Sequence, residues 1–262
     1  MVKLRRVFHR FLTGAPKAAA VGRERLNAEA WPDVVYAIGD VHGCYDELTT
    51  LEAMILADAQ SQAGEKWIIM LGDYTDRGPN SAAVLDKLCS RPPEGFRRFC
   101  LAGNHESMLL DFVANPQSSA VWLQFGGRET LASYGIDVER FLHVSKRRRV
   151  QILEGHIPSE HLDFLRGLPV CLSLPGAIFV HAGLRPGVPP ERQADTDMQW
   201  IREPFLSSNS SEFGLVIHGH TPTPEPEVKT NRIGIDTAAF ATSKLTAVRL
   251  SEHAQPAYLS TG

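Results

Sequence analysis

The chain has 262 residues, of which 43% are hydrophobic and 22% charged, and its formal net charge is −3. This composition excludes a disordered or collagen-like chain, and the small net charge argues against a nucleic-acid-binding protein, so no nucleic-acid partner is expected. The four cysteines are scattered and form no CxxC pair, which favours a reduced, cytoplasmic protein over a disulfide-bonded one.

Residues 1–32 are predicted to form a basic arm and linker. Within it, Leu4, Val7, Phe8 and Phe11 recur at helical spacing among cationic residues. This stripe is compatible with peripheral contact to an anionic membrane. A helix of this length is marginal on its own, so an arm that packs on its own domain or frays is the favoured interpretation. No apolar run reaches the length of a membrane span, and no apolar core typical of a secretory signal follows the basic start.

Three strand–loop–helix units are predicted next. Each begins with an apolar run that ends in glycine and a polar residue, and continues with apolar residues at helical spacing. Three such units in succession predict an α/β sheet with crossover helices. The expected strands cover 34–38, 67–71 and 99–102, and the expected helices cover 45–57, 79–88 and the stretch through 108–112.

The second half of the chain is predicted to be mostly helical over 118–168 and then to return to strands. Residues 185–213 form a loop region with several Pro and Ser residues, and a loop of this length in a compact domain is usually functional. One domain is therefore expected over 33–251, followed by a tail over 252–262. The later strands are expected over 177–180, 215–217, 233–235 and 245–250.

Polar motifs stand where the predicted strands end. They supply carboxylate, imidazole and carboxamide groups beside glycines, which let the backbone turn sharply at a crowded centre. Because ligands bind at the carboxyl ends of strands in α/β sheets, separate strand ends can converge on one site. The motifs are GDVHG at 39–43, GDYTDRG at 72–78, GNHE at 103–106, HAG at 181–183 and HGHT at 218–221.

The donor groups of these motifs predict a metal centre. They include two Asp, one Asn and at least three His, but no thiolate, so a structural zinc site is not expected. Mixed oxygen and imidazole donors suit Mn, Fe or Zn. About six ligands are too many for one ion with open positions and fit two ions that share a carboxylate, as in phosphatases and nucleases. His218, two residues before His220, is expected to pack or to support a ligand.

In this order, the motifs resemble those of the phosphoprotein phosphatases within the calcineurin-like metallophosphoesterases. They look most similar to the bacterial branch that includes the bacteriophage lambda protein phosphatase. The resemblance covers about residues 33–250 and extends to GCY at 43–45, WIRE at 200–203 and IDT at 235–237. It implies an α/β fold, the four-layer α/β/β/α metallophosphoesterase sandwich, with the catalytic domain over 33–251.

The resemblance also implies roles for individual residues. Two divalent metal ions are expected, Mn²⁺ first and Fe or Zn as alternatives, with Asp73 bridging them. His105 is expected to be the general acid for the leaving group, oriented by Asp76. Asn104 is expected both to hold metal and to contact the substrate phosphate. The remaining metal ligands are Asp40, His42, His181 and His220, and the arginines expected to clamp the phosphoryl oxygens are Arg77 and Arg202.

These roles predict a metal-dependent phosphomonoesterase in which a water activated by two cations attacks phosphorus. The cations and guanidinium groups would neutralise the phosphoryl oxygens, and a His held by a carboxylate would protonate the leaving oxygen. The favoured activity is a protein serine/threonine phosphatase, with a phosphoprotein or phosphopeptide as substrate.

Two alternatives are considered. One is a dinucleoside tetraphosphate (diadenosine tetraphosphate) hydrolase, whose bacterial family shares the fold and most motifs. That family has Ala in place of the motif Asp and Asp in place of the motif Glu, so Asp76 and Glu106 favour the phosphatase. In addition, the 185–213 loop has only Trp200 and Phe205 as aromatic residues, and Trp200 is expected to pack the phosphate clamp. The other alternative is an inactive metal-binding scaffold, against which the complete residue set argues.

Overall fold

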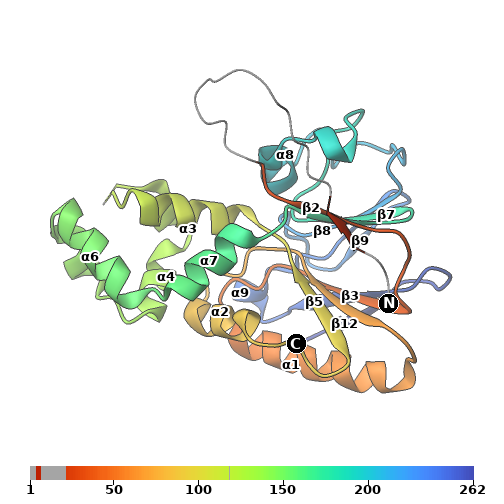
Figure 1. Ribbon diagram of the computed structural model, residues 1–262, viewed down its shortest axis with the longest axis horizontal. Helices are drawn as coiled ribbons and strands as arrows, with labels where there is room; N and C mark the ends of the chain where they lie inside the picture. The colour runs from red at the N-terminus through yellow and green to blue at the C-terminus, as the bar shows by residue number, and fades with distance from the viewer. Residues whose placement is uncertain (1–3, 7–21, 118) are drawn as a thin grey trace.

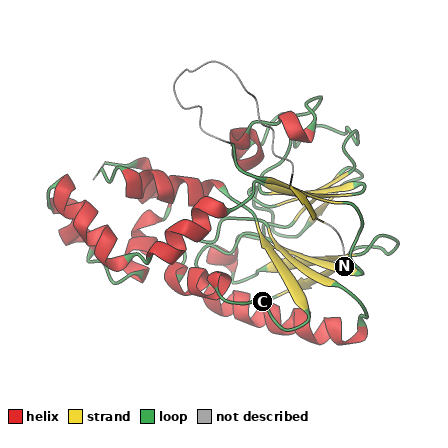
Figure 2. Cartoon of the chain, viewed as in Figure 1, coloured by secondary structure: helices red, strands yellow, loops and turns green. Residues whose placement is uncertain are grey.

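A computed structural model describes residues 4–6, 22–117 and 119–262. Two β-sheets lie face to face, with helices on their outer sides (Figures 1 and 2). The expected α/β/β/α sandwich is confirmed.

The first sheet has the strand order β12-β11-β3-β4-β5. Its strands β3, β4 and β5 are parallel, and α1 and α2 connect them in turn, as the three predicted strand–loop–helix units require. The bounds are β3 Val34–Ile38, β4 Lys66–Met70, β5 Phe96–Cys100, β11 Thr246–Leu250, β12 Ala257–Ser260, α1 Tyr45–Asp58 and α2 Ser81–Cys89.

The second sheet has the strand order β1-β2-β6-β7-β8-β10-β9. Strands β7, β8 and β10 are parallel to one another, so their carboxyl ends lie at the same edge. The bounds are β1 Leu4–Arg6, β2 Arg25–Ala28, β6 Cys171–Leu174, β7 Ala177–Val180, β8 Leu215–His218, β9 Glu227–Val228 and β10 Arg232–Gly234.

Further helices flank this sandwich. Those between β5 and β6 form a group at one end of the molecule (Figure 1). Their bounds are α3 Asn104–Ala114, α4 Gly127–Ser133, α5 Val138–His143, α6 Lys146–His156 and α7 Ser159–Gly167, and those of the later helices are α8 Asp195–Trp200 and α9 Ala239–Thr242. Short 3-10 helices are η1 Ala59–Ser61, η2 Val121–Phe125 and η3 Pro190–Arg192.

Strand β3 shows how the sequence specifies the layers. It is apolar at every position and wholly buried, as expected for a parallel strand covered on both faces. Successive side chains point to opposite faces, so Tyr36 and Ile38 pack with the helices α1 and α2, whereas Val35 and Ala37 pack between the two sheets. A third apolar cluster, which includes Met198, lies between the second sheet and α8.

The predicted strands and helices of the first sheet are confirmed within a few residues, as are β7, β8, β10 and β11. Both sheets also take strands from outside 33–251: β1 and β2 come from the expected arm and linker, and β12 comes from the expected tail. The helical spacing that begins at Leu4 does not give a helix at its start, because residues 4–6 form β1 and pair with β2. Its remaining positions lie outside the described residues.

Within the described ranges, no helix is long and apolar enough to cross a membrane.

Candidate metal centre

Loops from both sheets meet at the carboxyl ends of the parallel strands. From the first sheet, the loops after β3 and β4 carry Asp40 and Asp73, and Asn104 begins the helix α3 that follows β5. From the second sheet, the loops after β7 and β8 carry His181 and His220. All five side chains are buried. The convergence predicted from the strand-end motifs is therefore present.

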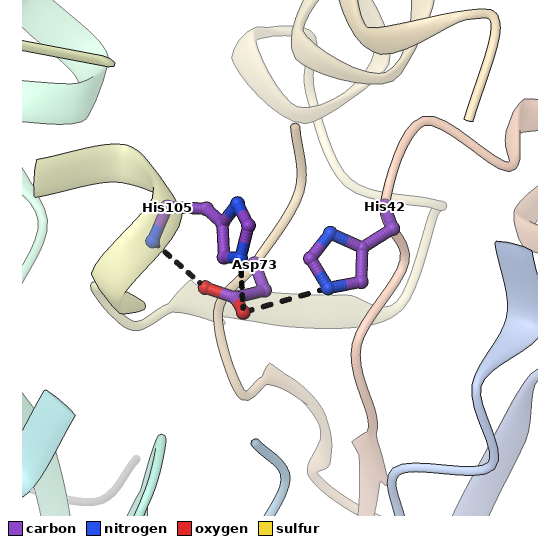
Figure 3. A group of neighbouring side chains, drawn as sticks. All are labelled: His42, Asp73 and His105. Carbon is purple, nitrogen blue, oxygen red and sulfur yellow. Dashed lines mark hydrogen bonds and ion pairs between the residues drawn. The ribbon is translucent and has the colours of Figure 1, made fainter. Parts of the chain in front are cut away.

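The Asp73 carboxylate is shared by two groups of potential metal ligands. One group contains His42, Asp73 and His105, and the other contains Asp73, His181 and His220. Figure 3 shows His42 and His105 on either side of Asp73. Asp73 Oδ2 lies 3.5 Å from His42 Nε2 and 3.8 Å from His105 Nε2, and Asp73 Oδ1 lies 3.4 Å from His181 Nε2. A carboxylate common to two donor sets suits a pair of ions.

Asn104 lies beside the second group. Its Oδ1 lies 2.9 Å from His181 Nε2 and 3.1 Å from His220 Nδ1. The structure thus brings together Asp73, Asn104, His181 and His220, the four residues expected around one ion. Their roles as ligands stay predictions.

Backbone carbonyls orient two of the imidazoles. His42 Nδ1 lies 2.8 Å from the Thr75 carbonyl oxygen, and His181 Nδ1 lies 3.0 Å from that of Leu71. A carbonyl can only accept, so each Nδ1 carries the proton and donates. Both Nε2 atoms consequently face Asp73. Metal-binding histidines are usually held in this way by a hydrogen bond from the other ring nitrogen.

Buried carboxylates concentrate negative charge here. Burial raises the pKa of Asp40 well above its usual range, and the carboxylates of Asp236 and Asp73 raise it further. Burial likewise raises the pKa of Asp236. Divalent cations would relieve this repulsion, so the donor set and its charge fit the expected metal ions. Asp40 lies outside both ligand groups, and its oxygens accept the backbone N–H of His220 at 3.1 and 3.2 Å.

His105 is held by Asp76. Its Nδ1 lies 2.7 Å from Asp76 Oδ2, and burial, which lowers the pKa of His105, is outweighed by the Asp73 and Asp76 carboxylates, which raise it. Asp76 also accepts from Trp122 Nε1 at 2.7 Å and from Thr130 Oγ1 at 2.6 Å. The imidazole therefore presents Nε2 to the centre in a fixed orientation.

The two candidate phosphate-binding arginines differ in position. The half-buried Arg77 donates to His42 Nε2 at 2.9 Å, and its Nη2 lies 3.2 Å from His105 Nε2. Arg202 is exposed. Burial, followed by the nearby charges of His181 and Arg202, lowers the pKa of His220 to about 3. Trp200, expected to pack the clamp, is 44% exposed, and its ring lies edge-on to that of His220 at 6.2 Å.

The loops hold these groups in an uncommon backbone conformation. A residue with a side chain rarely adopts positive φ, and such strain concentrates at functional sites. Among the described non-glycine residues, those with positive φ are His42, Asp73, Asp76, Arg77, His220, Ala238 and Ser243, and all but Ser243 belong to the strand-end loops around the centre.

Glu106 organises the loop that carries Asp73. The two oxygens of its buried carboxylate accept the backbone N–H groups of Asp73, Tyr74 and Gly103 at 2.8, 2.8 and 3.0 Å. The motif containing Glu106 was recognised from the sequence, but its contacts across 32 and 33 residues carry no local signal. The sequence also carries no signal for Trp122 and Thr130, which donate to Asp76 across 46 and 54 residues.

His218 contacts residues outside the two ligand groups. Its Nδ1 donates to the Gly219 carbonyl at 3.0 Å, and its ring lies edge-on to Phe205 at 5.1 Å. It belongs to neither ligand group. This position agrees with the expected packing role.

Comparisons with known proteins identify the family. The sequence profile described as calcineurin-like phosphoesterase matches residues 34–236. Curated proteins named bis(5′-nucleosyl)-tetraphosphatase PrpE, asymmetrical, are similar over 82% of this chain. The protein of Oceanobacillus iheyensis is 27% identical over 236 residues and is covered to 88% of its length, and that of Bacillus mycoides is 25% identical over 234 residues and is covered to 89%.

Solved structures share the fold. One described as a candidate diadenosine tetraphosphatase has a TM-score of 0.60 at 19% identity, over 90% of this chain and 97% of that chain. A protein serine/threonine phosphatase from Saccharomyces cerevisiae has a TM-score of 0.51 at 15% identity, over 87% of this chain and 80% of that chain. The fold therefore accommodates both substrate classes and does not choose between them.

The expected protein serine/threonine phosphatase activity, with a phosphoprotein or phosphopeptide substrate, is wrong, because the similar curated proteins are named tetraphosphatases. That expectation depended on Asp76 and Glu106. Both carboxylates are buried and bonded to protein groups, so they shape the loops rather than contact the group attached to phosphate. Their identity therefore carries little information about the substrate.

The contacts of Glu106 lead to a prediction. In Glu106→Gln, one of the two oxygens becomes an NH₂ group that faces backbone donors. We expect Mn²⁺ affinity, measured by titration calorimetry, to fall about 10- to 100-fold, as for other residues that position metal ligands. The free energy of unfolding in urea should fall by about 1–3 kcal/mol.

The matched control is Glu160→Gln on the exposed surface of α7. It should change neither quantity. An unaltered Mn²⁺ affinity in Glu106→Gln would show that the Asp73 loop does not depend on this carboxylate.

Proposed function

Because the chain belongs to the calcineurin-like phosphoesterase family, we propose that it is a metal-dependent hydrolase of dinucleoside tetraphosphates. The observation that carries the proposal is the similarity to PrpE tetraphosphatases, which extends over 82% of this chain. The shared Asp73 between two ligand groups supports a two-metal reaction at phosphorus. The proposed cleavage is asymmetrical and yields a nucleoside triphosphate and a nucleoside monophosphate.

In this proposal, Asp73 would be common to the sites of two divalent ions, Mn²⁺ or alternatively Fe or Zn. Asp40 and His42 would complete the site of one ion, and Asn104, His181 and His220 would complete the site of the other. When bound, the ions activate a water molecule as nucleophile and neutralise charge on the phosphoryl oxygens. The protein contributes the fixed orientation of the imidazoles and the exclusion of bulk water by burial.

Arg77 and Arg202 are proposed to bind the phosphoryl oxygens. A guanidinium group can meet two such oxygens with its planar donors. The attacking water adds to the outermost phosphorus, next to one nucleoside, and the bond from that phosphorus to the bridging oxygen breaks. The bridging oxygen leaves with the other three phosphates, and His105 Nε2 is placed to donate a proton to it while Asp76 holds Nδ1.

Product analysis tests the proposed activity. Purified protein with Mn²⁺ should convert diadenosine tetraphosphate into equal amounts of ATP and AMP, and a chelator should abolish the reaction. The kcat/KM should exceed that for a phosphoserine peptide at least tenfold, or about 1.4 kcal/mol in transition-state stabilisation. Two ADP molecules as product would contradict asymmetrical cleavage, and a preference for the phosphopeptide would contradict the substrate class.

His105 belongs to one ligand group with Asp73 and His42, so a role as metal ligand competes with the role of general acid. The two roles predict different results. If His105 is the general acid, the His105→Asn protein should have a kcat on phenyl phosphate about 10²–10⁴ lower and should retain the metals. The loss on p-nitrophenyl phosphate should be smaller, because its leaving group needs less protonation. Asp76→Asn should show a milder form of the same pattern. Equal losses on both esters, accompanied by loss of metal, would instead make His105 a ligand.

A further inference from the structure

A cavity of about 660 Å³ opens beside the candidate metal centre. One wall comes from η2 and the start of α4 and includes Phe125 and Arg128. Another wall comes from α9 and consists of Phe240, and Arg77 lines the cavity as well. The volume lies within the range of about 300–1,000 Å³ that small-molecule sites occupy. Apart from Arg77, no residue that lines this cavity has a role assigned above.

Arg77 and Phe240 connect the cavity to the centre. The Arg77 guanidinium contacts His42 and His105 and also lies over the Phe240 ring, 4.8 Å from its centroid. The Phe240 ring meets the His42 ring edge-on at 5.5 Å. A molecule whose phosphate reaches Arg77 can therefore extend its remaining part directly into the cavity.

The cavity walls include exposed aromatic surface. Phe240 is 41% exposed and Phe125 is 45% exposed, although each has a large apolar ring. Single exposed apolar residues are ordinary, but these two line the same cavity beside a centre rich in charge. Gln124 and Arg128 add hydrogen-bonding groups to the lining. Aromatic faces with a few polar groups are the features that recognise a planar, polar-edged ligand.

The η2–α4 wall is joined to Arg77 through the backbone. The Gly126 carbonyl accepts the Arg77 N–H at 3.2 Å. Gly126 has φ of 107°, and a Cβ atom there would collide with the Arg77 backbone nitrogen. Only glycine permits this approach. The aromatic wall and the candidate phosphate-binding arginine are thus positioned by one contact.

We propose that this cavity binds the nucleoside adjoining the phosphate that is attacked, with its base against Phe240 and Phe125 and its phosphate on Arg77. This assignment rests on the proposed function, because the substrate class supplies the nucleoside. Base–aromatic stacking strengthens binding about 5- to 150-fold per base. The assignment also explains why the few aromatic residues of the 185–213 loop did not indicate the substrate: the proposed stacking surface comes from Phe125 and Phe240.

The test compares two ligands that differ only in the base. Binding of AMP and of ribose 5-phosphate to the Mn²⁺-loaded protein is measured by titration calorimetry. The ratio of their Kd values reports the contribution of the base to binding, because any effect on phosphate binding is common to both ligands. The unaltered protein should bind AMP at least tenfold more tightly. Phe240→Leu and Phe125→Leu should each lower that ratio about fivefold or more.

Two further variants locate the base. Val121→Ala changes an exposed apolar residue of η2 that does not line the cavity, and it should leave the ratio unchanged. Trp200→Leu changes the exposed aromatic residue beside His220. If Trp200→Leu removes the preference for AMP while both Phe variants keep it, the base binds elsewhere and the proposal is overturned.

The outcomes separate the two proposals. Asymmetrical hydrolysis of diadenosine tetraphosphate, together with a ratio that neither Phe variant changes, overturns the cavity assignment and leaves the proposed function standing. Absence of that hydrolysis, together with equal affinity for AMP and ribose 5-phosphate, overturns both.

Discussion

The carboxylate of Asp73 is the group on which the rest of the site depends. It adjoins imidazoles from both sheets, with His42 on one side and His181 on the other, and it belongs to both ligand groups. Its own backbone is left-handed, at φ of 53°, and is held there by Glu106. A carboxylate buried away from water costs free energy unless positive charge balances it. The surrounding loops turn imidazole Nε2 atoms toward it, and divalent cations held between these groups would supply that charge.

The sandwich places Asp73 by simple means. Parallel strands in each sheet end at the same edge, and the two sheets pack face to face through apolar side chains such as Val35 and Phe179. Loops from both sheets consequently converge without a long excursion of the chain. Beyond this edge, η2 and α9 approach Arg77 from segments more than a hundred residues apart and add aromatic surface to the centre. The candidate metal ligands and the aromatic walls of the proposed nucleoside cavity thus come from different parts of the sequence.

Much of the fold and the convergence of the candidate ligands could be predicted from local sequence pattern. Strand β3 and the loop with Asp40 and His42 were predictable, because an apolar run followed by glycine and polar residues is a local signal. Strand β2 lacks that signal, because its sequence RLNA has only two apolar residues. Its pairing with β6, far along the chain, cannot be predicted from local pattern. The prediction of the substrate class was wrong for a related reason. It treated Asp76 and Glu106 as markers of the substrate, but both residues bond to buried protein groups that are distant in sequence, such as Trp122 for Asp76.

The metal content of the protein tests the role of Asp73 most directly. Elemental analysis after loading with Mn²⁺ and desalting should find two ions per chain in the unaltered protein. Asp73→Asn should lose most of this metal, because both ligand groups lose their common carboxylate, while His218→Asn should retain both ions, since His218 lies outside both groups. Two ions per chain in Asp73→Asn would contradict the account, as would a loss in His218→Asn as large as that in Asp73→Asn.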